Sequence, residues 1–337
     1  MVSGRNSNGW KDEKTENINT FDSVKAAIIN QYGPPEVLQI AEIPIPDITA
    51  DEVLVKVMAA AVNPVDWKQR QGWHKLFLKA HFPVVLGYDI SGEVVKCGDR
   101  ITQFKTGDKV YGRLTRRFGG AYAEYAAASG SAIALKPSNL SWEEAAAVPL
   151  ASISALQSLR DKCQIKQGDK VLLIGAAGGL GHFVLQIAKS MGAEVTAVCS
   201  SRHKKMMDEL SPARFIDYTA TDYKSAGICY DVVYDSAGKE SYRTTKHILN
   251  RGGIYLTTLP RPKLLVHKLL ALFAGKRVKT FLMKSLGEDL EIISEMIKNG
   301  EMKIYIDSVF PLDQIVDAHK RAEEYQTEGK IIIKINA

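Results

Sequence analysis

The residues best suited to hold a reactive cofactor form a short turn of glycine and alanine near the middle of the chain. Four apolar residues, 171–174, lead directly into Gly-Ala-Ala-Gly-Gly-Leu-Gly at 175–181, and apolar residues at helical spacing follow at 182–189. This order predicts a strand, a tight turn and a helix. Small residues let backbone N–H groups approach a pyrophosphate, and the positive end of the helix points at the same anion. The turn therefore predicts a dinucleotide-binding site.

The fingerprint of such turns is G-x-G-x-x-G, and the match here runs through Ala176, Gly178 and Gly181, with alanine replacing the first glycine. At Gly178 and Gly179 a side chain would point toward the pyrophosphate or force an unfavourable φ angle. A buried glycine turn without any ligand is the alternative interpretation. The predicted cofactor contacts in the turn are Ala177, Gly178, Gly179, Leu180 and Gly181.

The next predicted strand, residues 194–199, indicates which dinucleotide binds. An NAD site requires a carboxylate about 20 residues beyond the glycines, to accept hydrogen bonds from the ribose hydroxyls. The first acid after this strand is Asp208, whereas hydroxyl and basic side chains come before it. Those side chains suit a 2′-phosphate, so we expect NADPH; a solvated helix start is the alternative. The predicted phosphate contacts are Ser200, Ser201, Arg202 and Lys205.

Composition favours an enzyme with two domains. The 337 residues are 45% hydrophobic, and the net charge of +6 is too small to indicate a nucleic-acid partner. Four scattered cysteines form no C-x-x-C pair, so neither a disulfide framework nor a structural zinc site is expected. No apolar run is long enough to span a membrane, and residues 1–22 lack an apolar signal core. We therefore expect a cytoplasmic protein.

The pattern of strands and helices divides the chain into an α/β protein with two architectures. Residues 1–22 are polar and predict a disordered tail, whereas 23–145 are rich in short strands broken by proline and glycine, as in a partly open β-barrel. Residues 146–289 alternate strands with helices, which predicts a doubly wound parallel sheet of the Rossmann type. Residues 290–337 return to strand character, ending in Lys-Ile-Ile-Ile-Lys-Ile, and are expected to rejoin the barrel.

Six ordered motifs resemble the medium-chain dehydrogenase/reductase family, specifically its zinc-free quinone oxidoreductase branch, which is similar to zeta-crystallin. Within that branch the chain looks similar to the chloroplast-envelope quinone oxidoreductase homologue and to the mitochondrial reticulon-interacting protein. The resemblance covers residues 23–337 and implies a GroES-like barrel beside the Rossmann domain. The motifs are Asn-Pro-Val-Asp-Trp-Lys at 63–68, Gly-Tyr-Asp-Ile-Ser-Gly-Glu at 87–93, Gly-Asp-Lys-Val-Tyr at 107–111, Gly-Ala-Tyr-Ala-Glu-Tyr at 120–125, Ala-Ala-Gly-Gly-Leu-Gly at 176–181 and Gly-Lys at 329–330.

The resemblance also implies that catalysis proceeds without zinc. Zinc-dependent members carry Cys, His and Glu where this chain has Asn63, Tyr88 and Asp89, and a further cysteine ligand is missing from residues 150–154. Asparagine and tyrosine are poor zinc ligands. The acceptor is then a quinone or an α,β-unsaturated carbonyl, because either takes a hydride with little Lewis-acid help. An NADPH-binding scaffold with little turnover is the alternative.

By resemblance, particular residues receive roles in this site. Asn63 lies beside the nicotinamide and the substrate, although Asn63 before a proline also fits a simple turn. Tyr88 is either catalytic or a packed core ring, and His74 stands where related enzymes place a proton-donating tyrosine, with water as the alternative donor. The implied cofactor contacts outside the glycine turn and the basic cluster are Ser154, Tyr218, Leu259 and Lys330.

Residues 261–284 are the least ordinary segment, with seven Lys or Arg, no acid and an apolar run between them. Leu265, Leu269, Leu272 and Phe273 share one helical face. A helix at a substrate pocket or in a homodimer interface is one interpretation. A surface helix that contacts anionic lipid is the other, and it would let a quinone dissolved in a membrane, or a lipid-derived enal, reach the site.

Overall fold

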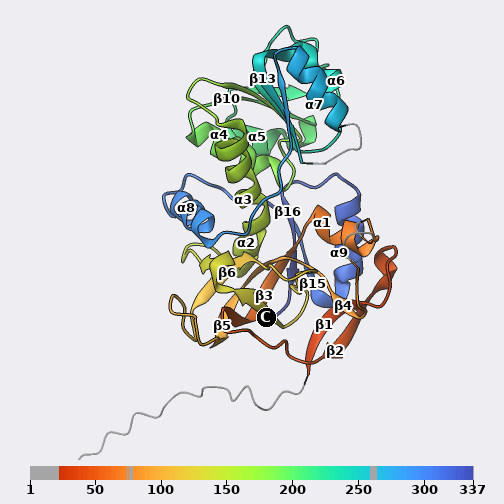
Figure 1. Ribbon diagram of the computed structural model, residues 1–337, viewed down its shortest axis with the longest axis vertical. Helices are drawn as coiled ribbons and strands as arrows, with labels where there is room; N and C mark the ends of the chain where they lie inside the picture. Colours follow the sequence, from red (N-terminus) through yellow and green to blue (C-terminus); the bar gives the residue numbers. More distant parts are fainter. Residues whose placement is uncertain (1–22, 74, 76–78, 259–263, 337) are drawn as a thin grey trace, which may run out of the picture.

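The computed structural model describes residues 23–73, 75, 79–258 and 264–336, so the expected tail at 1–22 lies outside the described residues. The chain forms an upper region built on a parallel sheet and a lower region whose strands are antiparallel except for the parallel pair β15 (Ile306–Pro311) and β16 (Lys330–Lys334) (Figure 1). This arrangement confirms the predicted α/β class with a partly open barrel and a doubly wound sheet.

The lower region contains one seven-stranded and one three-stranded sheet. The seven-stranded sheet follows the order β15-β16-β3-β5-β6-β8, with β7 paired to β3. Its strands are β3 (Glu52–Val62), β5 (Asp89–Cys97), β6 (Lys109–Arg113), β7 (Tyr125–Ser129), β8 (Ile133–Leu135), β15 (Ile306–Pro311) and β16 (Lys330–Lys334). The three-stranded sheet comprises β1 (Val24–Ile29), β2 (Leu38–Ile43) and β4 (Val84–Val85).

A few backbone contacts join the two lower sheets into an incomplete barrel. The N–H of Ala27 donates to the carbonyl of Tyr122 at 2.8 Å, and Ala26 forms an isolated bridge with Ala123. Inward-facing aliphatic residues such as Val55, Ile90 and Val110 fill the space between the sheets and are fully buried. The barrel therefore holds the start and end of the chain's described part in one core.

The upper sheet is parallel throughout, in the order β11-β10-β9-β12-β13-β14. Its central strand is apolar without alternation because both faces of a parallel sheet are covered. The chain order reverses between β10 and β12, on either side of β9, and ligands bind at the carboxyl ends of strands at such a switch point. The strands are β9 (Lys170–Ile174), β10 (Glu194–Cys199), β11 (Arg214–Asp217), β12 (Tyr230–Asp235), β13 (Leu249–Thr257) and β14 (Arg277–Lys279).

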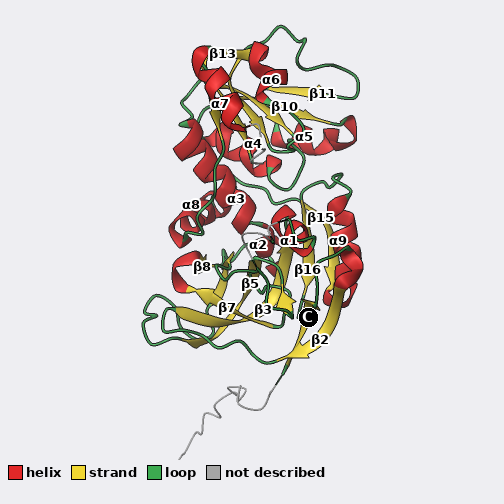
Figure 2. Cartoon of the chain, turned by 45° about the vertical axis from the view of Figure 1, so that its right-hand side comes forward, coloured by secondary structure: helices red, strands yellow, loops and turns green. Residues whose placement is uncertain are grey.

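Helices lie on both sides of the upper sheet (Figure 2). Residues of α3, α4 and α8 share one apolar core with the sheet, and residues of α6 and α7 share another. No helix in the described part of the chain is both long and apolar enough to cross a membrane. The helices are α1 (Pro64–Arg70), α2 (Trp142–Ala147), α3 (Pro149–Gln157), α4 (Gly181–Ser190), α5 (Lys204–Leu210), α6 (Tyr242–Thr245), α7 (Leu264–Phe273), α8 (Gly287–Lys298) and α9 (Ile315–Glu323).

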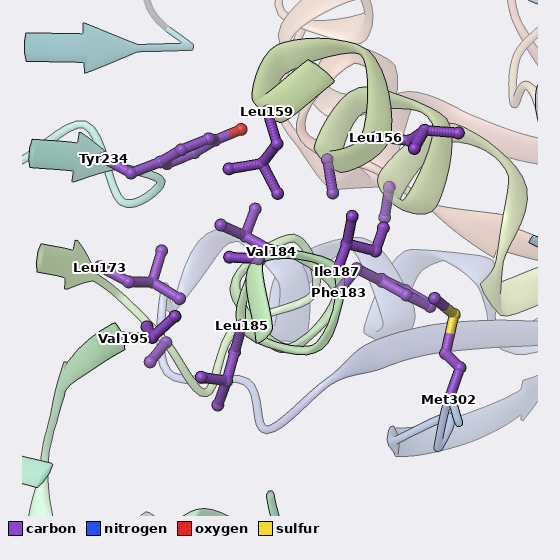
Figure 3. Close-up of a cluster of buried hydrophobic side chains, with 14 of the residues drawn as sticks. Leu156, Leu159, Leu173, Phe183, Val184, Leu185, Ile187, Val195, Tyr234 and Met302 are labelled. Carbon is purple, nitrogen blue, oxygen red and sulfur yellow. The ribbon is translucent and has the colours of Figure 1, made fainter. Parts of the chain in front are cut away.

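The core around α4 fixes the position of the glycine-rich turn. Phe183, Val184 and Leu185 are fully buried, and Figure 3 shows these side chains among residues of α3 and of the sheet. Burying a large apolar side chain contributes about 1.5–3 kcal/mol. Because α4 is held so firmly, the turn that precedes it cannot shift relative to the strand ends.

The last part of the chain differs from the predicted run of strands. Residues 301–337 contain a helix, α9, because Ile315, Ala318 and His319 share one helical face and are buried against the barrel. Two strands, β15 and β16, flank this helix and join the barrel sheet, as the expectation that the tail rejoins the barrel requires. The domain boundary expected between residues 289 and 290 falls inside α8, which packs on both α3 and β8.

Candidate cofactor and active site

The glycine-rich turn between β9 and α4 begins one residue earlier than the sequence match suggests. Gly175 adopts φ +84°, which favours glycine, and its N–H donates to Val198 on β10 at 3.0 Å. A Cβ atom on Gly181 would lie 2.1 Å from the carbonyl oxygen of Gly175. Gly175 and Gly181 therefore shape the turn, and Gly175, which the match did not include, is the residue that adopts the left-handed conformation.

The two glycines in the middle of the turn have ordinary φ angles, so the expected backbone strain at Gly178 and Gly179 is wrong. A Cβ on Gly178 would meet only the Gly175 oxygen, at 3.5 Å, which is ordinary contact. A Cβ on Gly179 would lie 3.0 Å from Cδ of Lys330. That a side chain here would point toward the pyrophosphate stays a prediction.

His182, in the first turn of α4, contacts the glycine-rich turn. Its Nδ1 donates to the carbonyl of Gly178 at 3.0 Å, and its ring packs edge-on against Tyr305. Burial lowers the pKa of His182 to about 4, so the ring is neutral at physiological pH and Nε2 carries no proton. Nε2 is buried and has no hydrogen-bond partner among the described residues. The sequence analysis assigned no role to His182, because the residue begins a stretch with the apolar spacing of a helix.

The basic cluster after β10 meets a segment of the lower region. Nη1 of Arg202 donates to Oε1 of Gln326 at 3.0 Å, and its Nε donates to Nε2 of His203 at 3.0 Å. His203 contacts Glu328 through Nδ1 at 2.6 Å. Arg202 thus lies at the predicted phosphate corner, with its guanidinium hydrogen-bonded to Gln326 and His203.

A carboxylate also lies at this corner, which the order of residues along the chain did not reveal. Asp217 ends β11, the strand beside β10, and hydrogen bonds from Thr219 and then Ser201 lower its pKa. The negative charge of Asp217 lies next to Ser201, whereas the sequence analysis expected only hydroxyl and basic side chains at this corner. Tyr218 follows on the surface, 54% exposed, and Lys205 is exposed on α5.

The lower region contributes a buried polar cluster centred on Asn63, the residue before α1. Its Nδ2 donates to Oδ2 of Asp89 at 3.0 Å, and its Oδ1 accepts from Nζ of Lys330. The other oxygen of Asp89 accepts from the N–H of Leu150 at 2.9 Å, and Lys330 approaches Asp89 at 3.6 Å. The structure therefore brings together Asn63 and Lys330, which lie 267 positions apart in the chain.

A second buried carboxylate adjoins this cluster. Oδ2 of Asp66 accepts from the backbone N–H of Asn63 at 2.7 Å and from the hydroxyl of Tyr122 at 3.0 Å. Burial raises the pKa of Asp66 to about 7 and raises the pKa of Asp89, whereas burial lowers the pKa of Lys330. Sequence reasoning quoted Asp66 within a motif but assigned it no role, because the partner Tyr122 is distant in the chain.

The glycine-rich turn and the polar cluster touch through the start of β16. The N–H of Gly329 donates to the carbonyl of Ala177 at 2.9 Å, and Gly329 forms a bridge with Gly178. The next residue is Lys330, whose stem lies beside Gly179 and whose ammonium reaches Asn63. A dinucleotide on the turn would therefore lie beside the stem of Lys330, and a contact between this lysine and the cofactor stays a prediction.

The remaining predicted residues are Tyr88, Ser154, His74 and Leu259. The hydroxyl of Tyr88 donates to the carbonyl of Arg117 and accepts from Gln69, both at 2.8 Å, and its ring packs under Arg113. Proton donation by Tyr88 would first require breaking the bond to residue 117, so a catalytic role stays a prediction. Ser154 is buried on α3, which packs against α4. His74 and Leu259 lie outside the described residues.

Asn63, Tyr88 and Asp89 stand where zinc-dependent members of the family carry metal ligands, and together they do not suit zinc. Asn63 and Tyr88 supply an amide and a hydrogen-bonded phenol, and the ammonium of Lys330 already adjoins Asp89. A cation at this point would face the lysine's positive charge. Within the part of the chain that the structure describes, no three His, Cys, Asp or Glu side chains gather as a metal site would need. Metal-assisted chemistry therefore has no donor set among these residues.

Two family models match separate parts of the chain. Residues 49–138 match the model of the alcohol dehydrogenase GroES-like domain, and residues 212–333 match that of zinc-binding dehydrogenases. The chain is 36% identical over 335 residues to a 2-methylene-furan-3-one reductase from Solanum lycopersicum, covering 95% of this chain and 81% of that protein.

Two further relatives extend the similarity to other named activities. The chain is 33% identical over 324 residues to a chloroplastic NADPH-dependent alkenal/one oxidoreductase from Arabidopsis thaliana, covering 92% of this chain and 79% of that protein. The solved structure of a quinone oxidoreductase from Coxiella burnetii matches with a TM-score of 0.87 and 32% identity, over 93% of this chain and all of that one.

Proposed function

Because the chain belongs to the medium-chain dehydrogenase/reductase family, in its quinone oxidoreductase branch, we propose that it transfers a hydride from NADPH to a quinone or an α,β-unsaturated carbonyl. The observation that carries this proposal is the contact between Gly329 and Ala177, which joins the nucleotide turn to the buried ammonium of Lys330. The family predicted from the six motifs is confirmed.

The described residues fit a nicotinamide dinucleotide. Gly178 has no side chain to cover the turn, and the N-terminus of α4 at Gly181 can attract an anion bound there. When bound, the cofactor supplies the hydride; the protein holds it and orients the acceptor. Asn63 and Lys330 provide an amide and an ammonium near the reacting end, and they can stabilise negative charge that develops on an acceptor oxygen. Enones and quinones need only this help, because their charge delocalises onto oxygen.

A screen of acceptors tests the activity. We expect purified protein to oxidise NADPH in the presence of quinones or conjugated enones and to leave simple alcohols and NADP⁺ unreacted. Dialysis against a chelator should leave the rate unchanged, since no step uses a metal. If no acceptor of either class is reduced while NADPH still binds, the alternative of a low-turnover NADPH-binding scaffold replaces the reductase.

The preference for NADPH over NADH rests on Arg202 and is opposed by Asp217. A guanidinium binds a 2′-phosphate through charge-assisted hydrogen bonds, whereas a carboxylate at this corner repels the phosphate and can accept from ribose hydroxyls. We place the balance with NADPH because Arg202 and Lys205 have no carboxylate partner among the described residues, whereas Lys204 pairs with Asp208 and Glu328 pairs with His203. The relative named for NADPH-dependent reduction of alkenals supports the same choice.

Arg202→Ala tests the cofactor preference. The variant should bind NADPH about one to two decades more weakly, since losing a charge-assisted contact costs about 1.5–3 kcal/mol, and should bind NADH nearly as before. Arg214→Ala removes an exposed arginine from the other end of β11 and serves as the matched control. Wild-type protein that binds both cofactors equally would contradict the preference for NADPH.

The helix α7 supports a second proposal, a peripheral contact with an anionic membrane through residues 261–284. Its exposed apolar side chains are Leu265, Val266, Leu269, Leu270, Leu272 and Phe273. A helix with so much exposed apolar surface and basic neighbours binds anionic lipid headgroups and the upper acyl region. Flotation with vesicles containing phosphatidylserine should carry the protein upward, and Leu269→Ser/Phe273→Ser should abolish this.

The same exposed surface supports our expectation of a homodimer, which would cover the apolar side chains with a second copy. Sedimentation of the protein without lipid distinguishes the two occupants. A dimer that the double α7 variant dissociates supports self-association, whereas a monomer that floats with vesicles supports membrane contact.

The cytoplasmic location stays a prediction. The relative that reduces alkenals is named chloroplastic, so organelles are among the compartments that cell fractionation must examine.

A further inference from the structure

An arginine beside the buried polar cluster leaves most of its hydrogen-bonding capacity unused. Arg113, the last residue of β6, is half-buried. Its Nη1 donates to Oγ of Ser285 at 2.7 Å and, at 3.4 Å, to the carbonyl of Leu114. Its Nε is buried without a partner, and no hydrogen bond among the described residues involves its Nη2. The edge of the guanidinium that Nε and Nη2 form is therefore unpaired.

Two other arginines show how this fold holds a guanidinium whose role is structural. Arg70 bonds through all three of its nitrogens, to a backbone carbonyl, to His319 and to Glu323. Arg321 on α9 does the same, mainly through two acidic side chains. By contrast, none of the ion pairs in the described part of the chain includes Arg113. A guanidinium offers five N–H donors, and the fold uses only those of one nitrogen in Arg113.

The pairing of β5 with β6 places Arg113 next to the polar cluster. Arg113 stands opposite Asp89 in this pairing, so the two side chains leave the same face of the sheet, with Cβ atoms about 4.5–5.5 Å apart. Asp89 already bonds Asn63 and lies 3.6 Å from the ammonium of Lys330. Arg113 is therefore a further cationic donor beside the amide and the ammonium that we assign to the reacting end.

Packing holds this guanidinium in place before any ligand arrives. Its Cζ lies 4.3 Å from the centre of the Tyr88 ring, and two hydrogen bonds fix that ring in turn. The bond to Ser285 comes from the upper region, from the segment 280–286 between β14 and α8. Because this segment forms neither helix nor strand, it can move aside and let a ligand reach Nε. A planar donor held in this way loses little freedom on binding.

We propose that Arg113 selects acceptors that carry a carboxylate, which its Nε and Nη2 bind through two parallel hydrogen bonds. The proposal rests on the proposed reductase function and names its substrate class, a conjugated ketone or quinone with an acidic substituent. Two parallel N–H donors match the two oxygens of a carboxylate, whereas a neutral substituent leaves the buried Nε unpaired.

The anion at Arg113 belongs to the acceptor rather than to the cofactor. The proposed function assigns the phosphates of NADPH to the turn at 175–181 and to Arg202, at the ends of β9 and β10. The carboxylate takes no part in the chemical change. Its binding orients the conjugated system for hydride transfer, so Arg113 acts on specificity.

Binding of 3-benzoylpropionate to the protein with NADP⁺ tests the site without turnover, because this keto acid has no activated double bond. By calorimetric titration, the wild type should bind the acid at least about tenfold more tightly than its methyl ester. Arg113→Met should weaken binding of the acid by about tenfold to a hundredfold, the effect of losing hydrogen bonds between charged groups, and leave the ester unaffected. Arg117→Met removes a nearby exposed arginine and is the matched control.

Turnover gives a second measurement. With 3-benzoylacrylate, the conjugated form of the same acid, Arg113→Met should raise KM by about tenfold or more and change kcat little, as expected for loss of uniform binding. The methyl ester should show neither change. Arg113→Lys keeps the charge and a donor for Ser285 but lacks the fork, so it should recover only part of the affinity for the acid.

The outcomes separate this proposal from the reductase function. Equal affinity of the wild type for acid and ester, or unchanged affinity for the acid in Arg113→Met, would overturn the proposal even if neutral enones are reduced. Weaker NADPH binding by Arg113→Met at an unchanged melting temperature would also overturn it, because the arginine would then contact the cofactor. If the wild type binds the acid through Arg113 yet reduces no acceptor, the reductase function fails while the binding site stands.

Discussion

The two halves of the proposed active site recognise their ligands by opposite means. The turn at 175–181 offers backbone groups, because its glycines carry no side chains that would cover them. The cluster of Asn63, Asp89 and Lys330 offers one amide and two ionisable side chains that are almost completely buried and already bonded to one another. A nucleotide can therefore bind the turn through backbone groups, whereas any group that reaches the cluster meets side chains that already hydrogen-bond one another.

Each half is also supported by a neutral, buried histidine. His182 donates to the turn at Gly178, and His319 on α9 accepts from Nη1 of Arg70 at 3.0 Å. Arg70 is fully buried and also pairs with Glu323. Burial lowers the pKa of His182 to about 4 and of His319 to about 3. The comparison thus leads to predictions about removing a charged side chain, about lowering the pH and about adding a side chain at a glycine.

Removing the ammonium from the cluster should have the largest effect. Lys330→Met leaves Asp89 buried beside an apolar chain, and breaking a buried pair in this way costs about 3–5 kcal/mol of unfolding free energy. Lys330→Met/Asp89→Asn removes both charges and should recover much of the loss. Urea unfolding of the three proteins measures this. A single variant as stable as the wild type would show that the cluster is not an ion pair in solution.

Acid should destabilise both halves through their histidines. An unfolded histidine takes up a proton below about pH 6.5, whereas the folded His182 and His319 resist protonation until about pH 4 and 3. Stability is therefore complete above pH 6.5 and falls as the pH decreases, by about 2 kcal/mol for each histidine at about pH 5.

Thermal unfolding between pH 7.5 and 5 measures this loss. His319→Asn keeps an acceptor for Arg70, and His182→Asn keeps a donor for Gly178, so each variant should reduce the dependence on pH while preserving one contact. His247→Asn alters an exposed histidine and is the control. An unchanged slope in His319→Asn and His182→Asn would contradict the neutral state of both rings.

Alanine substitutions in the glycine-rich turn should have a smaller effect on stability, and this effect should differ between Gly181 and Gly178. Gly181→Ala places Cβ 2.1 Å from the Gly175 oxygen, so the backbone must move, at a cost of about 1–3 kcal/mol, and nucleotide affinity should fall with stability. Gly178→Ala meets no atom closer than 3.5 Å and should leave the melting temperature unchanged. Titration with NADPH completes the comparison, because weaker binding by stable Gly178→Ala would show that the phosphates occupy that space. Equal stability of the two variants would refute the assigned turn geometry.

The sequence predicted the turn far better than the cluster, for a physical reason. The turn is local, so a strand, small residues and a helix in direct succession specify it, although the positive φ was expected at Gly178 or Gly179 and occurs at Gly175. The cluster joins residues from four distant segments, and the partnerships of Asp66 with Tyr122 and of Asn63 with Lys330 depend on how the barrel closes. Resemblance placed Asn63 and Lys330 in one site, but no spacing along the chain could reveal their contact.

The contact of Gly329 with Ala177 constrains how the molecule can open. Strand β16 belongs to the lower sheet, yet its first residues are anchored to the upper region by a backbone hydrogen bond. Any rotation that separates the two regions without breaking this bond must use it as a pivot. The separation then increases with distance from residue 329, so Lys330 and its partner Asn63 stay beside the turn. A ligand could then exchange without loss of the contact between the turn and the cluster.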